Sequence, residues 1–82
     1  MSVSNRQEEL ARRGLIAEKR EALGRLESRI SGAVDMVRVA TSTLMGFDSL
    51  DADQVREAAE VLAEAIEARQ RLLAEIKQLE EF

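Results

Sequence analysis

The spacing of apolar residues along the first half of the chain predicts a long amphipathic helix. Apolar side chains recur in alternating steps of three and four residues, in two columns: Ile16, Leu23, Ile30, Val37 and Leu44, and between them Leu26, Ala33, Ala40 and Phe47. This alternation is typical of the seam of a left-handed coiled coil. We therefore expect a first helix over about residues 5–45. The Phe47 ring is expected to close the end of a narrow core.

The second half of the chain carries more apolar surface than one neighbouring helix can cover. Three columns run along it: Val55, Leu62 and Ile76; Ala59, Ile66 and Leu73; and Ala58, Ala65, Leu72 and Leu79. A single partner helix covers a two-column seam, whereas a three-column face is typical of a helix inside a bundle. We expect a second helix over about residues 52–81 whose excess apolar face packs against another chain.

The stretch TSTLMGFDSLDADQ separates the two helices. Gly46 suits the left-handed position just past a helix that ends at Leu44 or Met45. Asp51 can accept hydrogen bonds from the free N–H groups of the following turn, which marks the start of the second helix. A turn over about residues 46–51 joins antiparallel neighbours. The predicted fold is all-α: one antiparallel, coiled-coil-like helical hairpin that dimerises into a four-helix bundle.

Arg69 interrupts an apolar column of the second helix, between Leu62 and Ile76. One interpretation is that its stem packs in the seam while the guanidinium reaches water. The other is an ion pair with Glu27, which antiparallel pairing about a turn centred near Asp48 places opposite Arg69. Polar seam residues of this kind are best known for fixing register or oligomeric state. Glu27 and Arg69 are therefore a candidate register-setting pair, and both interpretations remain open from the sequence.

Residue types limit the chemistry that this chain can perform. Among its 82 residues there is no His, Cys, Tyr or Trp, which removes the commonest general base, thiol nucleophiles and soft metal ligands. Carboxylates recur at helical spacing at Glu57, Glu60, Glu64 and Glu67. Di-iron bundles pair such residues with His and point them inward, so a solvated face is the better interpretation here. We expect no enzymatic activity, no cofactor and no metal.

Charge is distributed unevenly along the sequence. Up to Thr41 there are eight Lys and Arg residues against six acids, and after it four against ten, so the two halves carry charges of +2 and −6. Helices folded side by side gain a little from this attraction. The Arg-rich start also raises an alternative, a nucleic-acid-associated accessory protein. Interleaved acids and the lack of stacking aromatics there make nucleic acid an improbable partner.

The N-terminal segment is the best candidate for binding a partner. In an antiparallel hairpin the longer first helix overhangs the second, and this overhang carries the candidate partner-binding residues Arg6, Leu10, Arg12, Arg13 and Leu15. A short helix without packing is marginal, so the overhang is expected to fray or to dock on a second copy or on another protein. The sequence also lacks the apolar run of a signal peptide or membrane span.

The predicted function follows from these expectations. We expect a cytoplasmic, non-catalytic, self-associating hairpin that forms a homodimer or a higher homo-oligomer. It would act as a protein–protein interaction or assembly module of the adaptor or co-chaperone kind, with a protein partner whose identity the sequence does not give.

Overall fold

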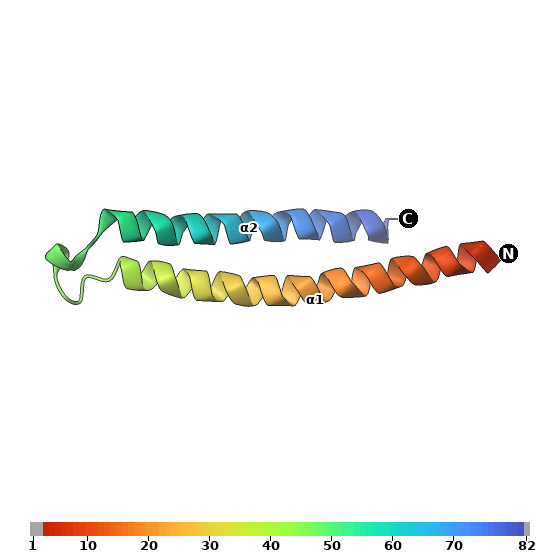
Figure 1. Cartoon of the computed structure of the whole chain (residues 1–82), viewed down its shortest axis with the longest axis horizontal. Coiled ribbons are helices and arrows are strands. Elements are labelled where there is room, and N and C mark those ends of the chain that lie inside the picture. Colours follow the sequence, from red (N-terminus) through yellow and green to blue (C-terminus); the bar gives the residue numbers. More distant parts are fainter. Residues whose placement is uncertain (1–2, 82) are drawn as a thin grey trace.

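Two long antiparallel helices form a rod in the computed structural model, which describes residues 3–81 and the side chains of residues 5–81. Helix α1 (Val3–Ala40) and helix α2 (Ala52–Glu80) are joined by a tip that contains the short 3-10 helix η1 (Phe47–Ser49). The rod measures 69 × 14 × 14 Å. The start of α1 and the end of α2 lie at the end of the rod opposite the tip, and α1 projects beyond α2 there (Figure 1). The all-helical hairpin that the apolar spacing predicts is confirmed.

The core of the hairpin is a thin seam between the two helices. Only Ala33, Ala58, Ala65 and Ile76 are buried among the described residues. Half-buried seam positions continue the three-and-four spacing on both helices: Ile16, Lys19, Leu23, Leu26, Ile30, Val37 and Ala40 on α1, and Val55, Leu62, Arg69, Leu72 and Leu79 on α2. The predicted seam of the first helix is thus present from Ile16 to Ala40.

The first helix ends at Ala40, earlier than the predicted end at Leu44 or Met45. The run Thr41, Ser42, Thr43 accounts for the difference. The Thr41 hydroxyl donates to the Val37 carbonyl at 2.7 Å. Such hydroxyls offer the backbone alternatives to the helical ladder and disfavour its continuation. Gly46 consequently does not cap α1; its positive φ of 89° instead turns the chain into η1.

The expectation that Phe47 closes the core is wrong for this hairpin. Because α1 stops at Ala40, the tip leaves the seam, and the exposed fractions of Leu44, Met45 and Phe47 are 94%, 86% and 80%. The seam column that the sequence extends through Leu44 to Phe47 therefore ends at Ala40. Three large apolar side chains project from the tip instead of filling it.

The start of α2 is fixed by the predicted cap. Asp51 has an extended backbone, and its carboxylate accepts from the backbone N–H groups of Asp53 at 2.9 Å and Gln54 at 3.4 Å. Asp53 adds a second negative charge at the positive end of the helix dipole. This confirms the Asp51 cap and fixes where the chain re-enters the seam.

Removing this cap should destabilise the hairpin. Asp51→Ala is expected to lower the free energy of unfolding by about 1 kcal/mol, because two N–H groups of the first turn lose their acceptor. Urea unfolding followed by circular dichroism measures the change. Asp48→Ala, which removes the exposed carboxylate of η1, is the matched control and should have a smaller effect. Equal losses from the two variants would contradict the capping role.

Candidate functional site

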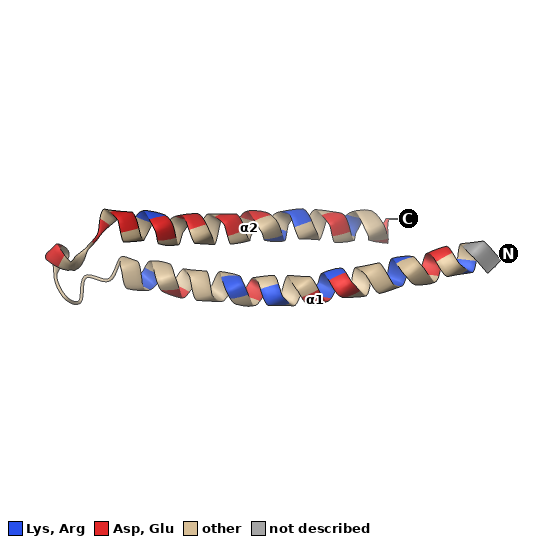
Figure 2. Cartoon of the chain, in the orientation of Figure 1, with Lys and Arg blue, Asp and Glu red and all other residues tan. Residues whose placement is uncertain are grey.

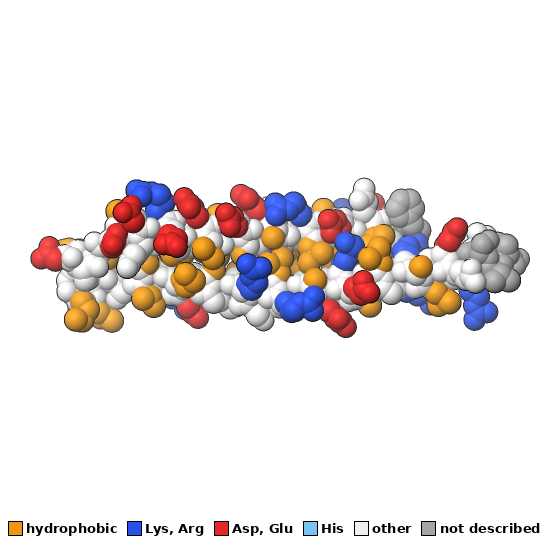
Figure 3. Space-filling model, in the orientation of Figure 1, with side chains coloured by type: hydrophobic (Ala, Val, Ile, Leu, Met, Phe, Trp, Pro, Cys, Tyr) orange, Lys and Arg blue, Asp and Glu red, His pale blue; other side chains and the backbone are white. Residues whose placement is uncertain are grey.

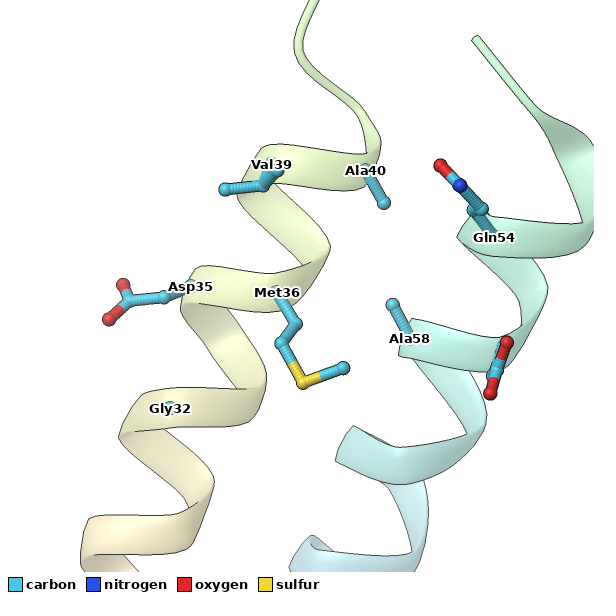
Figure 4. A pocket seen from close by; sticks show the side chains of 8 residues that line it. Gly32, Asp35, Met36, Val39, Ala40, Gln54 and Ala58 are labelled. Atoms are coloured by element: carbon cyan, nitrogen blue, oxygen red, sulfur yellow. The ribbon is translucent and has the colours of Figure 1, made fainter.

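An open groove beside the seam lies close to the tip. Its volume is about 470 Å³, and its lining combines apolar side chains with a few polar ones at the rim: Gly32, Asp35, Met36, Val39, Ala40, Gln54, Glu57 and Ala58. Met36 points into the space between the helices, whereas Asp35 and Val39 point away from it (Figure 4). The exposed fractions of Met36 and Val39 are 49% and 77%. We call this the Met36 groove.

A second groove lies near the middle of the rod. It has a volume of about 450 Å³ and is lined by Glu27, Ile30, Ser31, Ile66, Arg69 and Gln70. Heptad positions place it on the other side of the seam from the Met36 groove, because Glu27 and Ser31 flank Ile30 on the side opposite Met36. We call it the Ile66 groove. The hairpin therefore has a hollow on each flank, with a mostly polar lining around Ile30 and Ile66 in the second one.

The Ile66 groove is bordered by the candidate register-setting pair. Arg69 donates from Nε to Glu27 Oε2 at 3.2 Å, and its Nη2 lies 3.2 Å from the same oxygen. The exposed side-chain fractions are 39% for Arg69 and 49% for Glu27. The structure brings the two residues together, and both retain access to water. Exposed pairs of this kind contribute only ~0.2–1 kcal/mol, so a role in register remains a prediction.

Two further ion pairs join the helices near the open end of the hairpin. Lys19 Nζ lies 3.0 Å from Glu75 Oε2, and Arg20 pairs with Glu80. Lys19 occupies a seam position and is half-buried. The apolar columns predicted from the sequence omitted it, although its place three residues after Ile16 and four before Leu23 could have identified it. These pairs and Glu27–Arg69 all connect α1 to α2.

The five candidate partner-binding residues do not form one site. Helical spacing puts Arg6, Leu10 and Arg13 on one face of α1, while Arg12 and Leu15 lie on another. The exposed fractions of Leu10 and Leu15 are 56% and 42%, and Arg12 is half-buried. Arg13 pairs with Glu9 one turn earlier at 2.7 Å.

The sequence-based candidates omitted the most exposed apolar residues. Leu44, Met45 and Phe47 at the tip, and Met36 and Val39 next to it, are all more exposed than Leu15. Hydrophobic side chains gather along the line between the helices and at the tip (Figure 3). No pattern in the sequence identified the tip, because the heptad spacing that continues through Leu44 and Phe47 predicts buried positions. Only the early end of α1 exposes them.

Residues 3–81 contain neither a metal-binding cluster nor a membrane-spanning helix. No group of three or more carboxylates there is arranged to hold a metal ion. Within the same residues, neither helix has a stretch long and apolar enough to cross a membrane. Comparison with known proteins adds no assignment, since no family model, curated protein or solved structure matches the chain. The function must be argued from these residues alone.

Substitutions at the groove test the register role of the ion pair. Glu27→Ala should lower the free energy of unfolding by up to about 1 kcal/mol, and by more than Glu21→Ala at an exposed site of the same helix. Arg69→Leu should leave stability equal or higher, because an apolar side chain suits the seam, while loosening register or oligomeric state. Urea unfolding and light scattering measure the two effects. If Glu27→Ala unfolds like the wild type, Arg69 merely extends to water.

Proposed function

We propose that this protein is a non-catalytic, self-associating helical hairpin that serves as an assembly or adaptor module. The observation that carries the proposal is the amount of apolar surface left uncovered. Among the described residues, eleven large hydrophobic side chains are exposed, whereas Ile76 is the one large side chain that is buried. Groups of exposed apolar side chains, such as those at the tip and along the flanks, often mark a surface that another molecule covers.

The energetics of so short a chain support the same proposal. A domain of this size gains only a few kcal/mol of net stability from a single core. Here three of the four buried residues are Ala, whose side chains remove little apolar area from water. Packing a second molecule against the flanks would bury Ile66, Leu73 and their neighbours and so supply the buried apolar area that the seam lacks. Association and stability are coupled in this proposal.

The arrangement of charges favours a protein partner over nucleic acid. Arg13, Lys19 and Arg20 each pair with a carboxylate of the chain. A phosphate backbone would have to compete with these carboxylates, and acidic residues recur along α2 (Figure 2). Basic and acidic residues that lie next to one another suit contact with a protein surface that also carries both signs of charge.

Light scattering at ~10 µM and above tests self-association. The mass should be at least twice the 9.1 kDa of one chain, because the open apolar flanks are then covered. The measurement should be repeated at high salt to separate apolar from electrostatic attraction. Apolar association should survive high salt. A mass of one chain throughout this range would contradict the proposal.

A further inference from the structure

We propose that the surface around Ile66 binds a second copy of this chain in the antiparallel orientation, about a two-fold axis that passes beside Ile66. The inference rests on the proposed self-association and specifies its face and direction. In this arrangement α2 packs against α2 of the second copy, and α1 against its α1. The tip of each hairpin then lies beside the open end of the other.

The exposed column of α2 is complementary to itself in this orientation alone. Ala59, Ile66 and Leu73 recur every seven residues on one face; Ala59 is exposed, and the exposed fractions of Ile66 and Leu73 are 40% and 36%. A two-fold axis at Ile66 sets Leu73 of each copy against Ala59 of the other, large against small. In a parallel two-fold pair through the same flank the axis runs along the rods and lays α2 against α1 of the second copy, so this column would not meet itself.

The Ile66 groove lies at the level of the proposed axis. Ile66 and Ile30 line its floor, and the Glu27–Arg69 pair forms part of its rim. An axis beside Ile66 brings Ile66 of the second copy to this hollow, where it fills the space as a knob fills a hole. The ion pair then loses water on one side. The register that the ion pair favours within one hairpin would then also favour one alignment of the two copies.

The charge of the rod favours the antiparallel direction. Residues 30–65, which form the half nearer the tip, carry seven acids and two basic residues, whereas the rest of the chain carries nine acids and ten basic residues. The tip half is therefore strongly negative and the rest slightly positive. Figure 2 shows acidic residues prevailing on α2 near the tip and both signs of charge toward the open end. A parallel dimer would set the two negative halves side by side. The antiparallel dimer sets each against the other's open end.

Apolar residues at the two ends of the rod lie at similar distances from the proposed axis, so each end would meet the opposite end of the second copy. Leu10 lies on the same side of α1 as Ser31 of the groove, because three heptads separate them. It is roughly 28 Å from the level of Ile66, and the tip is about as far in the other direction. Leu10, with an exposed fraction of 56%, would meet the tip side chains Met45 and Phe47 of the second copy.

Directional cross-linking tests the orientation. Because the chain has no Cys, Arg13→Cys and Ser49→Cys introduce single thiols beside the proposed end contacts while leaving Leu10 and Phe47 intact. Arg13 is suitable because it lies on the same face of α1 as Leu10. The R13C and S49C proteins are mixed, allowed to exchange subunits and treated with a short bismaleimide. The R13C–S49C heterodimer should be the main cross-linked product. Cross-linking mainly within R13C alone and within S49C alone would show a parallel dimer and overturn the inference.

Matched substitutions test the face. Ile66→Glu should convert the dimer to monomer in light scattering, because a carboxylate would enter the Ile66 groove. Val61→Glu is the control: its exposed fraction of 38% is close to the 40% of Ile66, but its heptad position faces the other flank. It should remain dimeric. Loss of the dimer in the V61E protein alone would overturn the inference while leaving self-association intact. A wild-type monomer would overturn both proposals.

Discussion

The alanine-rich seam between α1 and α2 is the constraint on which the rest of the structure depends. Among the residues whose side chains the structure describes, its buried members are Ala33, Ala58, Ala65 and Ile76. Small side chains let two helix backbones approach closely, but they transfer little apolar area out of water, at about 25 cal/mol per Å². Few large side chains are therefore fully buried: those of the seam, such as Leu23 and Leu62, are half-buried, and others, such as Ile66 and Leu73, lie on the flanks.

The side chains that connect the two helices by ion pairs differ from the apolar side chains that could stabilise a dimer. Glu27–Arg69 and Lys19–Glu75 join the two helices, yet exposed ion pairs contribute little net stability, and their role in fixing the alignment remains a prediction. The apolar side chains that could contribute more, such as Ile66 and Leu73, lie beside the seam. In the proposed dimer the Ile66 and Leu73 side chains become part of the core. The ion pair at the edge of the Ile66 groove would then favour one register between the two copies.

Local chemistry made much of the fold predictable. The three-and-four spacing from Ile16 to Ala40 predicted the seam, and the Asp51 side chain predicted the start of α2, since both depend on residues close in sequence. The same spacing failed beyond Ala40, where hydroxyl side chains end the helix and leave Leu44 and Phe47 exposed. The candidate residues were less predictable, because Leu10 and Leu15 share a segment of sequence but not a face of α1.

The concentration dependence of thermal unfolding tests most directly whether the thin seam relies on a second chain. If association supplies the missing core, raising the protein concentration a hundredfold stabilises the native dimer by about 2.7 kcal/mol. The melting temperature followed by circular dichroism should then rise by about 5–10 °C. A melting temperature that stays the same across this range would show that the hairpin is stable alone, which would contradict the account.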